Sequence, residues 1–198
     1  MKKRNSFIMI ILFLLSFVFS GCASLDYRKP LNSSIQPKAS KSYLYGRFFL
    51  QRDFMNKWRL ALRFENITNG NIISIRLLNE KPVYAVEIDP GTYRLKDIVY
   101  APLGAMMDFE ITKLTVPSEP AYLHNSITVE PGKIYYLGDF SGSSRRVGFG
   151  TGVSGDAFAV CVLFKGGLVG VEQNFSTTTE EIKRLLPQLT DLEFNPAW

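Results

Sequence analysis

The thiol of Cys22 is the side chain with the clearest chemical role in this chain, because of the residues that precede it. Residues 2–4 form a basic head, Lys-Lys-Arg, and residues 7–19 form a thirteen-residue run in which only Ser16 is polar. Ser20-Gly21 then places two small residues directly before the cysteine. A basic head stays on the cytoplasmic side while the apolar run inserts, and the run is shorter than the roughly 20 residues of a spanning helix. The pattern therefore predicts a secretory signal that ends directly before Cys22.

The last four residues of this segment carry a family resemblance. Phe19-Ser20-Gly21-Cys22 resembles the lipobox of bacterial lipoproteins, with Phe19 in the place of the usual leucine. The resemblance implies that the thiol receives a diacylglycerol, that the chain is cut before Cys22, and that the new amine is also acylated, for example with palmitate. Several acyl chains together make a durable membrane anchor. In such lipoproteins an aspartate directly after the cysteine implies retention in the inner membrane. This chain has Ala23 there, and the resemblance therefore implies the outer membrane.

Two alternatives remain open for this segment: an ordinary secretory signal with a chance cysteine, or an uncleaved membrane anchor. Cleavage before Cys22 would remove 21 of the 198 residues and leave 177, about one domain. Three of the 23 basic residues leave with the signal, so 20 remain against 18 acids, a net charge of +2. With no basic cluster longer than Arg145-Arg146, the composition gives no indication of nucleic-acid binding.

Other residues that could do chemistry do not form a motif. His124 is the single histidine and has no nucleophile or acid at a recognisable spacing. The glycine-rich stretch 138–155 lacks the Gly-Lys-Ser/Thr signature of a phosphate loop, and it is interpreted as a flexible connection between strands. Five acids suggest a glycosidase pair or a calcium site but are scattered along the chain: Asp89, Asp97, Asp108, Glu110 and Asp139. We expect a non-enzymatic protein with no metal or cofactor, and a hydrolase assembled across strands is a distant alternative.

Three residues are candidates for contact with a ligand or partner. Arg145 and Arg146 could meet an anionic group, because loops often carry function. Tyr135 belongs to a set of tyrosines predicted to be half-buried in strands with solvated hydroxyl groups, or to line a ligand face. That set is Tyr43, Tyr45, Tyr84, Tyr93, Tyr100, Tyr135 and Tyr136. Cys161 lies in the apolar run 157–164 and is predicted to be a small buried hydrophobic residue without a disulfide partner.

The elements that must position these residues are mostly strands. Residues 58–66 and 73–77 alternate apolar and polar residues on either side of Asn69-Gly70, which predicts a hairpin. Asp89-Pro90-Gly91-Thr92 and Glu130-Pro131-Gly132-Lys133 predict two further hairpin turns. Further strands are predicted at the ends of these turns and over 109–116 and 157–164.

One helix is predicted near the C-terminus. Thr177 with Glu180, or Thr178 with Glu181, could form a capping box at its start, and Pro187 could end it. Ile182, Leu185, Leu186 and Leu189 would share its apolar face. Many short strands without a strand-helix-strand rhythm favour an antiparallel β-sandwich of about eight or nine strands with one short C-terminal helix.

The chain is thus divided into residues 1–21 as a removed signal, residues 22–42 as a lipidated N-terminus with a flexible tether, and residues 43–198 as one sandwich domain. A flexible segment of twenty residues reaches on the order of 25 Å. The alternative is that part of residues 23–42 packs on the domain as an edge strand.

A second resemblance rests on the paired Pro-Gly turns, of which Pro131-Gly132-Lys133-Ile134-Tyr135-Tyr136 is the fuller. It resembles small uncharacterised lipoproteins and the transthyretin-like, carboxypeptidase-regulatory sandwich modules over residues 43–140. The resemblance implies a binding or structural module in the cell envelope, on either face of the outer membrane. We expect the membrane as its partner through the lipid, together with an envelope protein. The alternative is an adhesin-like lipoprotein that binds a surface ligand from the host or environment.

Overall fold

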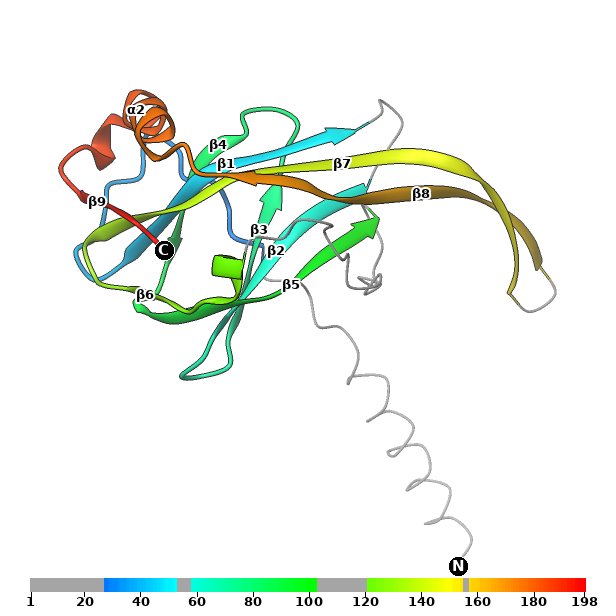
Figure 1. The fold of residues 1–198 in the computed structure, drawn as a ribbon, viewed down its shortest axis with the longest axis horizontal. Helices are drawn as coiled ribbons and strands as arrows, with labels where there is room; N and C mark the ends of the chain where they lie inside the picture. Colours follow the sequence, from blue (N-terminus) through cyan, green and yellow to red (C-terminus); the bar gives the residue numbers. More distant parts are fainter. Residues whose placement is uncertain (1–26, 53–57, 103–120, 155–156) are drawn as a thin grey trace, which may run out of the picture.

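Two β-sheets packed face to face form the body of the protein, and one helix covers the outer face of one of them (Figure 1). The computed structural model describes residues 27–52, 58–102, 121–154 and 157–198. The elements in chain order are β1 (Ser42–Arg52), β2 (Trp58–Asn66), β3 (Ile72–Leu77), β4 (Val83–Ile88), β5 (Gly91–Pro102), η1 (Ala121–His124), β6 (Ile127–Val129), β7 (Lys133–Ser154), β8 (Ala157–Glu172), α2 (Phe175–Leu185), η2 (Pro187–Leu189) and β9 (Glu193–Pro196).

The first sheet, here the β1 sheet, has the order β4-β1-β7-β8, and β9 also pairs with β7. The second, the β2 sheet, has the order β3-β2-β5-β6. This arrangement confirms the predicted mainly β sandwich with a short C-terminal helix. Most pairs are antiparallel, but β1 and β9 run parallel to β7. Parallel partners cannot be joined by a tight turn, and β1 and β7 are separated in the chain by β2 to β6.

Alternation along β1 explains why the molecule has two cores. Leu44, Phe48 and Leu50 point between the sheets and join the main core with residues of the β2 sheet. Tyr43 and Tyr45 point to the other face, where they pack with Ile182 and further residues of α2 and η2. Successive side chains of a strand lie on opposite faces, so β1 is buried on both. The strand beneath the helix, β1, is therefore packed on both of its faces.

The three predicted turns have different outcomes. Asn69-Gly70 joins the antiparallel strands β2 and β3, which confirms the predicted hairpin, and Gly70 has a φ of 72°. The prediction of hairpins at residues 89–92 and 130–133 is wrong. Strand β4 pairs with β1 in one sheet while β5 pairs with β2 in the other, and β6 and β7 are likewise in different sheets. Each of these turns reverses the chain but connects a strand of one sheet to a strand of the other.

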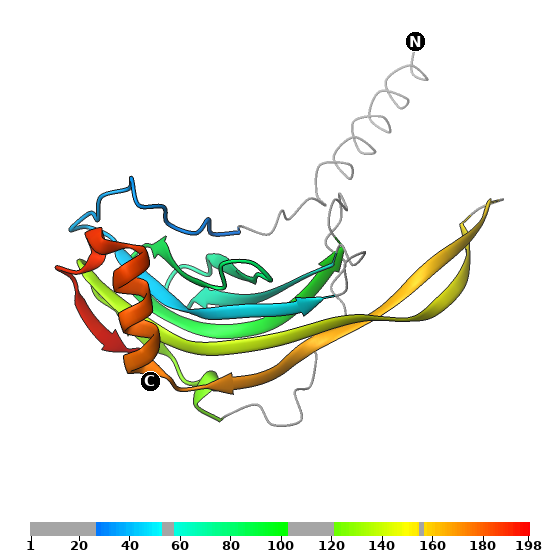
Figure 2. The same ribbon diagram turned by 90° about the horizontal axis from the view of Figure 1, so that it is seen from above.

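The glycine-rich stretch 138–155 is not a loop over its described part. Residues 138–154 belong to β7, and the pairing with β8 continues to Ser154 opposite Ala157. Beyond Ser144 the β7–β8 pair leaves the body of the sandwich as a long two-stranded arm (Figure 2). The predicted strand 157–164 is part of β8, while the predicted strand 109–116 lies outside the described residues.

The C-terminal helix begins earlier than the sequence predicts. Asn174 is the N-cap of α2 and makes no capping hydrogen bond with its side chain, so the predicted capping boxes are wrong. Thr178 lies inside the helix, and its hydroxyl group donates to Asp139 of β7 and does not cap the helix. The helix ends before Pro187, as predicted. Ile182, Leu186 and Leu189 are buried as predicted, but the Leu185 side chain is 47 % exposed.

Residues 27–41, here called the strap, run along the edge of the sandwich (Figure 2). The amide of Arg28 donates to the carbonyl of Ser74 on β3 at 2.9 Å, and the amide of Leu31 donates to Ala85 on β4 at 2.8 Å. These contacts correspond to the alternative in which part of the segment packs on the domain. The strap therefore connects the edge strands of both sheets, and only residues 23–26 separate it from the predicted lipidation site.

Candidate functional site

A β-bulge in β7 gathers polar side chains beneath α2. Tyr45 pairs with Tyr136 and Arg47 with Asp139, so Gly46 alone faces two residues of β7. Gly138, one of these two, has a φ of 117°, a conformation that favours glycine. The extra residue shifts the alternation of side chains by one position. As a result Tyr136 and Asp139 both point toward the helix.

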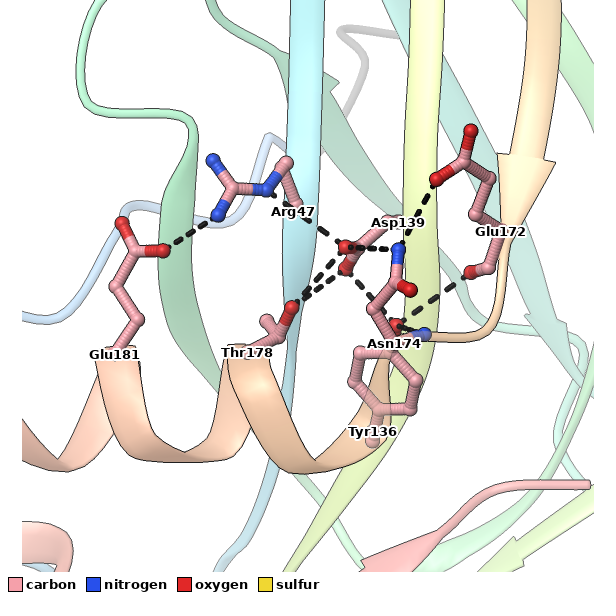
Figure 3. A network of polar contacts seen from close by, with 7 residues as sticks. All are labelled: Arg47, Tyr136, Asp139, Glu172, Asn174, Thr178 and Glu181. Atoms are coloured by element: carbon pink, nitrogen blue, oxygen red, sulfur yellow. Dashed lines mark hydrogen bonds and ion pairs between the residues drawn. The ribbon is translucent and has the colours of Figure 1, made fainter.

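Asp139 is the centre of the resulting network (Figure 3). Its carboxylate is only 6 % exposed and accepts hydrogen bonds from Tyr136 Oη at 2.9 Å and from Thr178 Oγ1 at 3.0 and 3.1 Å. Asn174 Nδ2 donates to the second carboxylate oxygen at 3.2 Å. Arg47 Nε lies 3.7 Å from the same oxygen. A buried carboxylate needs such partners, and here they come from β1, from β7, and from the N-cap and first turn of α2.

Further contacts attach α2 to β1 along its length. Arg47 Nη2 donates to Glu181 Oε2 at 2.5 Å, so its guanidinium group bridges the carboxylates of Glu181 and Asp139. Tyr45, two residues before Arg47 on β1, makes a second contact with the helix: its Oη lies 2.5 Å from Thr179 Oγ1. The network and the apolar contacts of Ile182 together fix the helix on the β1 sheet.

The geometry of the network favours a structural role over catalysis. Both carboxylate oxygens of Asp139 already accept hydrogen bonds from protein groups. The hydroxyl of Tyr136 also accepts from the amide of Asn174 at 2.9 Å. Burial, together with the bond to Asp139, raises the pKa of Tyr136 well above its ordinary value. The described contacts of Asp139 and Tyr136 thus use these groups to connect elements of the fold.

Six of the seven tyrosines in the predicted set have buried rings and hydroxyl groups that bind the protein, while the side chain of Tyr100 is not described. Tyr43 Oη accepts from the amide of Lys38 at 2.7 Å, and Tyr93 Oη donates to the carbonyl of Asp89 at 2.8 Å. Tyr84 Oη donates to the carbonyl of Arg76. The expectation of solvated hydroxyl groups is therefore wrong for these residues. These hydrogen bonds hold turns and the strap in place, and they give the buried hydroxyl groups the partners that they require.

We predict that these tyrosines make the fold sensitive to alkali. Burial raises the pKa of Tyr45 to about 12, and it raises those of Tyr84 and Tyr136 further. Because the folded state holds these protons more tightly than the unfolded state, their contribution is complete below about pH 10 and is lost as pH rises toward the folded pKa values. Phenolate absorbance and circular dichroism should change together above this pH. Normal titration of all tyrosines with intact structure would contradict the prediction.

The residues singled out from the sequence do not come together in one place. Cys22 lies outside the described residues, and Arg145 and Arg146 lie in the β7 arm, where only the strand is described. The ring of Tyr135 is buried in the main core, and its hydroxyl accepts from the amide of Glu130 at 3.1 Å. The side chain of His124 is exposed at the end of η1.

The five acids considered for a catalytic or calcium site are also separated. Asp89 pairs with Lys41, Asp97 pairs with Arg63, and Asp139 belongs to the network under α2. Asp108 and Glu110 lie outside the described residues, and the side chain of Cys161 is not described either. Within the described ranges, no group of three or more His, Cys, Asp or Glu residues is placed to hold a metal ion.

Two further findings do not concern a single site. Comparisons with protein-family models, with curated proteins and with solved structures found no match. In the part of the chain that the structure describes, no helix is both long enough and apolar enough to cross a membrane.

Proposed function

We propose that this chain is a bacterial lipoprotein, anchored to the outer membrane through lipids on Cys22, whose sandwich is a non-catalytic binding or structural module of the cell envelope. The observation that carries the proposal is the layout of residues 2–22: a basic head, a short apolar run and two small residues directly before a cysteine. Several acyl chains on that cysteine would hold the protein at a membrane without a spanning helix.

The β7–β8 arm supports the binding part of the proposal. In the described residues, β7 pairs only with β8 beyond Ser144, and β8 is the last strand of the β1 sheet. A two-stranded hairpin in isolation is only marginally stable, and an unpaired strand edge can accept another strand. An envelope protein that adds a strand to this edge would satisfy the exposed backbone groups.

The network under α2 supports the non-catalytic part. It is a buried cluster of charged and hydroxyl groups, and its described hydrogen bonds are made within the protein. A general base needs a carboxylate oxygen within reach of a substrate, whereas Asp139 uses both oxygens for Tyr136, Thr178 and Asn174.

The test of the anchor is the substitution Cys22→Ala in the full chain. Without the thiol no diacylglycerol can be attached, so the detergent-soluble lipoprotein should be replaced by an unprocessed precursor, and labelled fatty acid should no longer be incorporated. Cys161→Ala is the matched control, because it removes a thiol outside the signal and should leave processing unchanged. Unchanged size, fatty-acid labelling and membrane attachment in Cys22→Ala would contradict the proposal.

A further inference from the structure

The outer face of the β2 sheet carries more positive than negative charge. We call it the basic face and define it by the charged side chains that alternate with the core residues of β2, β3 and β5. Its described members are Arg63, Glu65, Arg76, Arg94, Lys96 and Asp97. Four cations therefore stand against two carboxylates.

The ion pairs around Glu65 leave Arg94 and Lys96 as the outermost charges of this face. Glu65 binds Lys96 Nζ at 3.2 Å and Arg94 Nη2 at 3.5 Å. The Arg94 side chain is 55 % exposed and that of Lys96 is 38 % exposed, but that of Glu65 is only 23 % exposed. Asp97 is only 14 % exposed and is held by Arg63. Glu65 lies beneath Arg94 and Lys96, so these two cations set a positive potential toward solvent. The Arg63 side chain, 18 % exposed, is about as buried as Asp97 and adds little exposed charge.

The opposite side of the molecule has no such excess. There α2 covers the β1 sheet, and its charged residues are Glu180, Glu181, Lys183 and Arg184. Their charges cancel in number. The two large faces of the sandwich therefore differ in charge.

The strap begins beside the basic face. Tyr27 forms a β-bridge with Ser74 of β3, and the guanidinium carbon of Arg76 lies 4.4 Å from the centroid of the Tyr27 ring. This contact places the ring on the side of the sheet that carries the charges. Lys29 follows with an exposed side chain and adds another cation. The chain thus enters the described structure at the positive side of the domain.

The length of chain before Tyr27 limits the distance from the lipid. Five steps along the backbone separate Cys22 from Tyr27, and these span at most about 18 Å when fully extended. A tether of twenty residues would let the sandwich tumble above the membrane, but the strap contacts with Ser74 and Ala85 leave no such freedom. The edge of the sandwich next to the basic face is therefore held close to whatever surface contains the lipid.

We propose that the basic face docks on the surface of the anchoring phospholipid bilayer and binds its anionic headgroups. The inference rests on the proposed lipid anchor at Cys22. Attraction between a basic surface and anionic lipid acts within about a Debye length, which is roughly 8–10 Å at moderate salt, and the short linker keeps the domain near that range. Docking turns α2 and the β1 sheet away from the membrane, where they are accessible to a protein partner.

The experiment uses the full lipidated protein, purified in detergent and reconstituted into vesicles, in a Cys161→Ser background. A fluorophore is attached either at Thr128→Cys, on the outer side of β6 beside the basic face, or at Ser176→Cys, on the exposed side of α2. Phosphatidylcholine with a nitroxide on its headgroup serves as the quencher. Vesicles contain either phosphatidylcholine alone or phosphatidylcholine mixed with phosphatidylglycerol.

On vesicles with phosphatidylglycerol we expect stronger quenching at residue 128 than at residue 176. This excess should be lost on phosphatidylcholine alone, in high salt, and in the variant Arg94→Gln/Lys96→Gln. The matched control Lys183→Gln/Arg184→Gln removes the same charge from the opposite face and should keep the excess. Equal quenching at both positions on anionic vesicles, or an excess that survives Arg94→Gln/Lys96→Gln, would overturn the proposal.

The mass of the N-terminal peptide of the same preparation reports the anchor independently. An acylated Cys22 with equal quenching at the two positions would refute the docking face and leave the proposed function intact. An unmodified N-terminus would refute the proposed function itself, whatever the quenching.

Discussion

The substitution Gly46→Ala is expected to lower the free energy of unfolding by about 3 kcal/mol, the upper end for overpacking a well-packed interior. A Cβ atom at Gly46 would overlap the carbonyl oxygen of Gly138 on the neighbouring strand. That oxygen belongs to the backbone of the β-bulge, so it cannot move aside as a flexible side chain could. The parallel pair of β1 and β7 would have to separate where it supports the network around Asp139.

Gly170→Ala is the matched control for this prediction. Gly170 also lies in a strand of the β1 sheet, but no heavy atom would lie within 4 Å of a Cβ atom there. Its substitution should change the free energy of unfolding by about 0.5 kcal/mol or less. Chemical denaturation of both variants makes the comparison. Equal stability of Gly46→Ala and Gly170→Ala would contradict the described contact between β1 and β7.

The substitution Asp139→Ala should cost about 3 kcal/mol, because it leaves buried donors without an acceptor. Tyr136, Thr178 and Asn174 each donate to this carboxylate, and Arg47 would keep only Glu181. The loss should loosen α2 before the rest of the fold, since the network connects the helix to β7. Hydrogen exchange of the α2 amides should therefore increase more than that of β2.

Thr177→Ala separates this effect from a general effect of altering the helix. Thr177 is exposed in the same turn of α2 as the buried Thr178. Its substitution should change the free energy of unfolding by about 0.5 kcal/mol or less. Hydrogen exchange of the α2 amides should stay as slow as in the parent protein. If Asp139→Ala behaved like Thr177→Ala, the network would not be what holds the helix.

The sequence was sufficient for the fold class but not for the path of the chain through it. Period-two alternation in residues 58–66 and 72–77, with Asn69-Gly70 between them, determines a hairpin locally. The turns at Pro90-Gly91 and Pro131-Gly132 use similar residues but join strands of different sheets. A turn sequence sets the local reversal of the backbone, whereas the sheet that the next strand joins depends on distant partners.

The composition of the glycine-rich stretch 138–155 favours a loop, but its described residues form a strand. Pairing decides the outcome: β8 supplies backbone partners opposite β7 as far as Ser154. Glycine weakens an isolated strand, but it does not prevent the ladder of hydrogen bonds.

The network around Asp139 could not have been assembled from the sequence. Asn174 and Thr178 lie 35 and 39 residues away from Asp139, and Arg47 is on a strand that pairs with β7 in parallel. One local signal was present. In the run Tyr136-Leu137-Gly138-Asp139-Phe140, both Leu137 and Phe140 are apolar although they are three residues apart, which breaks the alternation and indicates a bulge at the glycine.

The lipid anchor is the central claim, and the mass of the mature N-terminal peptide tests it most directly. We expect the peptide purified from membranes to begin at Cys22 and to carry a diacylglycerol on the thiol together with an acyl chain on the amine. A mature chain that begins at another residue, or one that begins at Cys22 with a free thiol, would contradict the account.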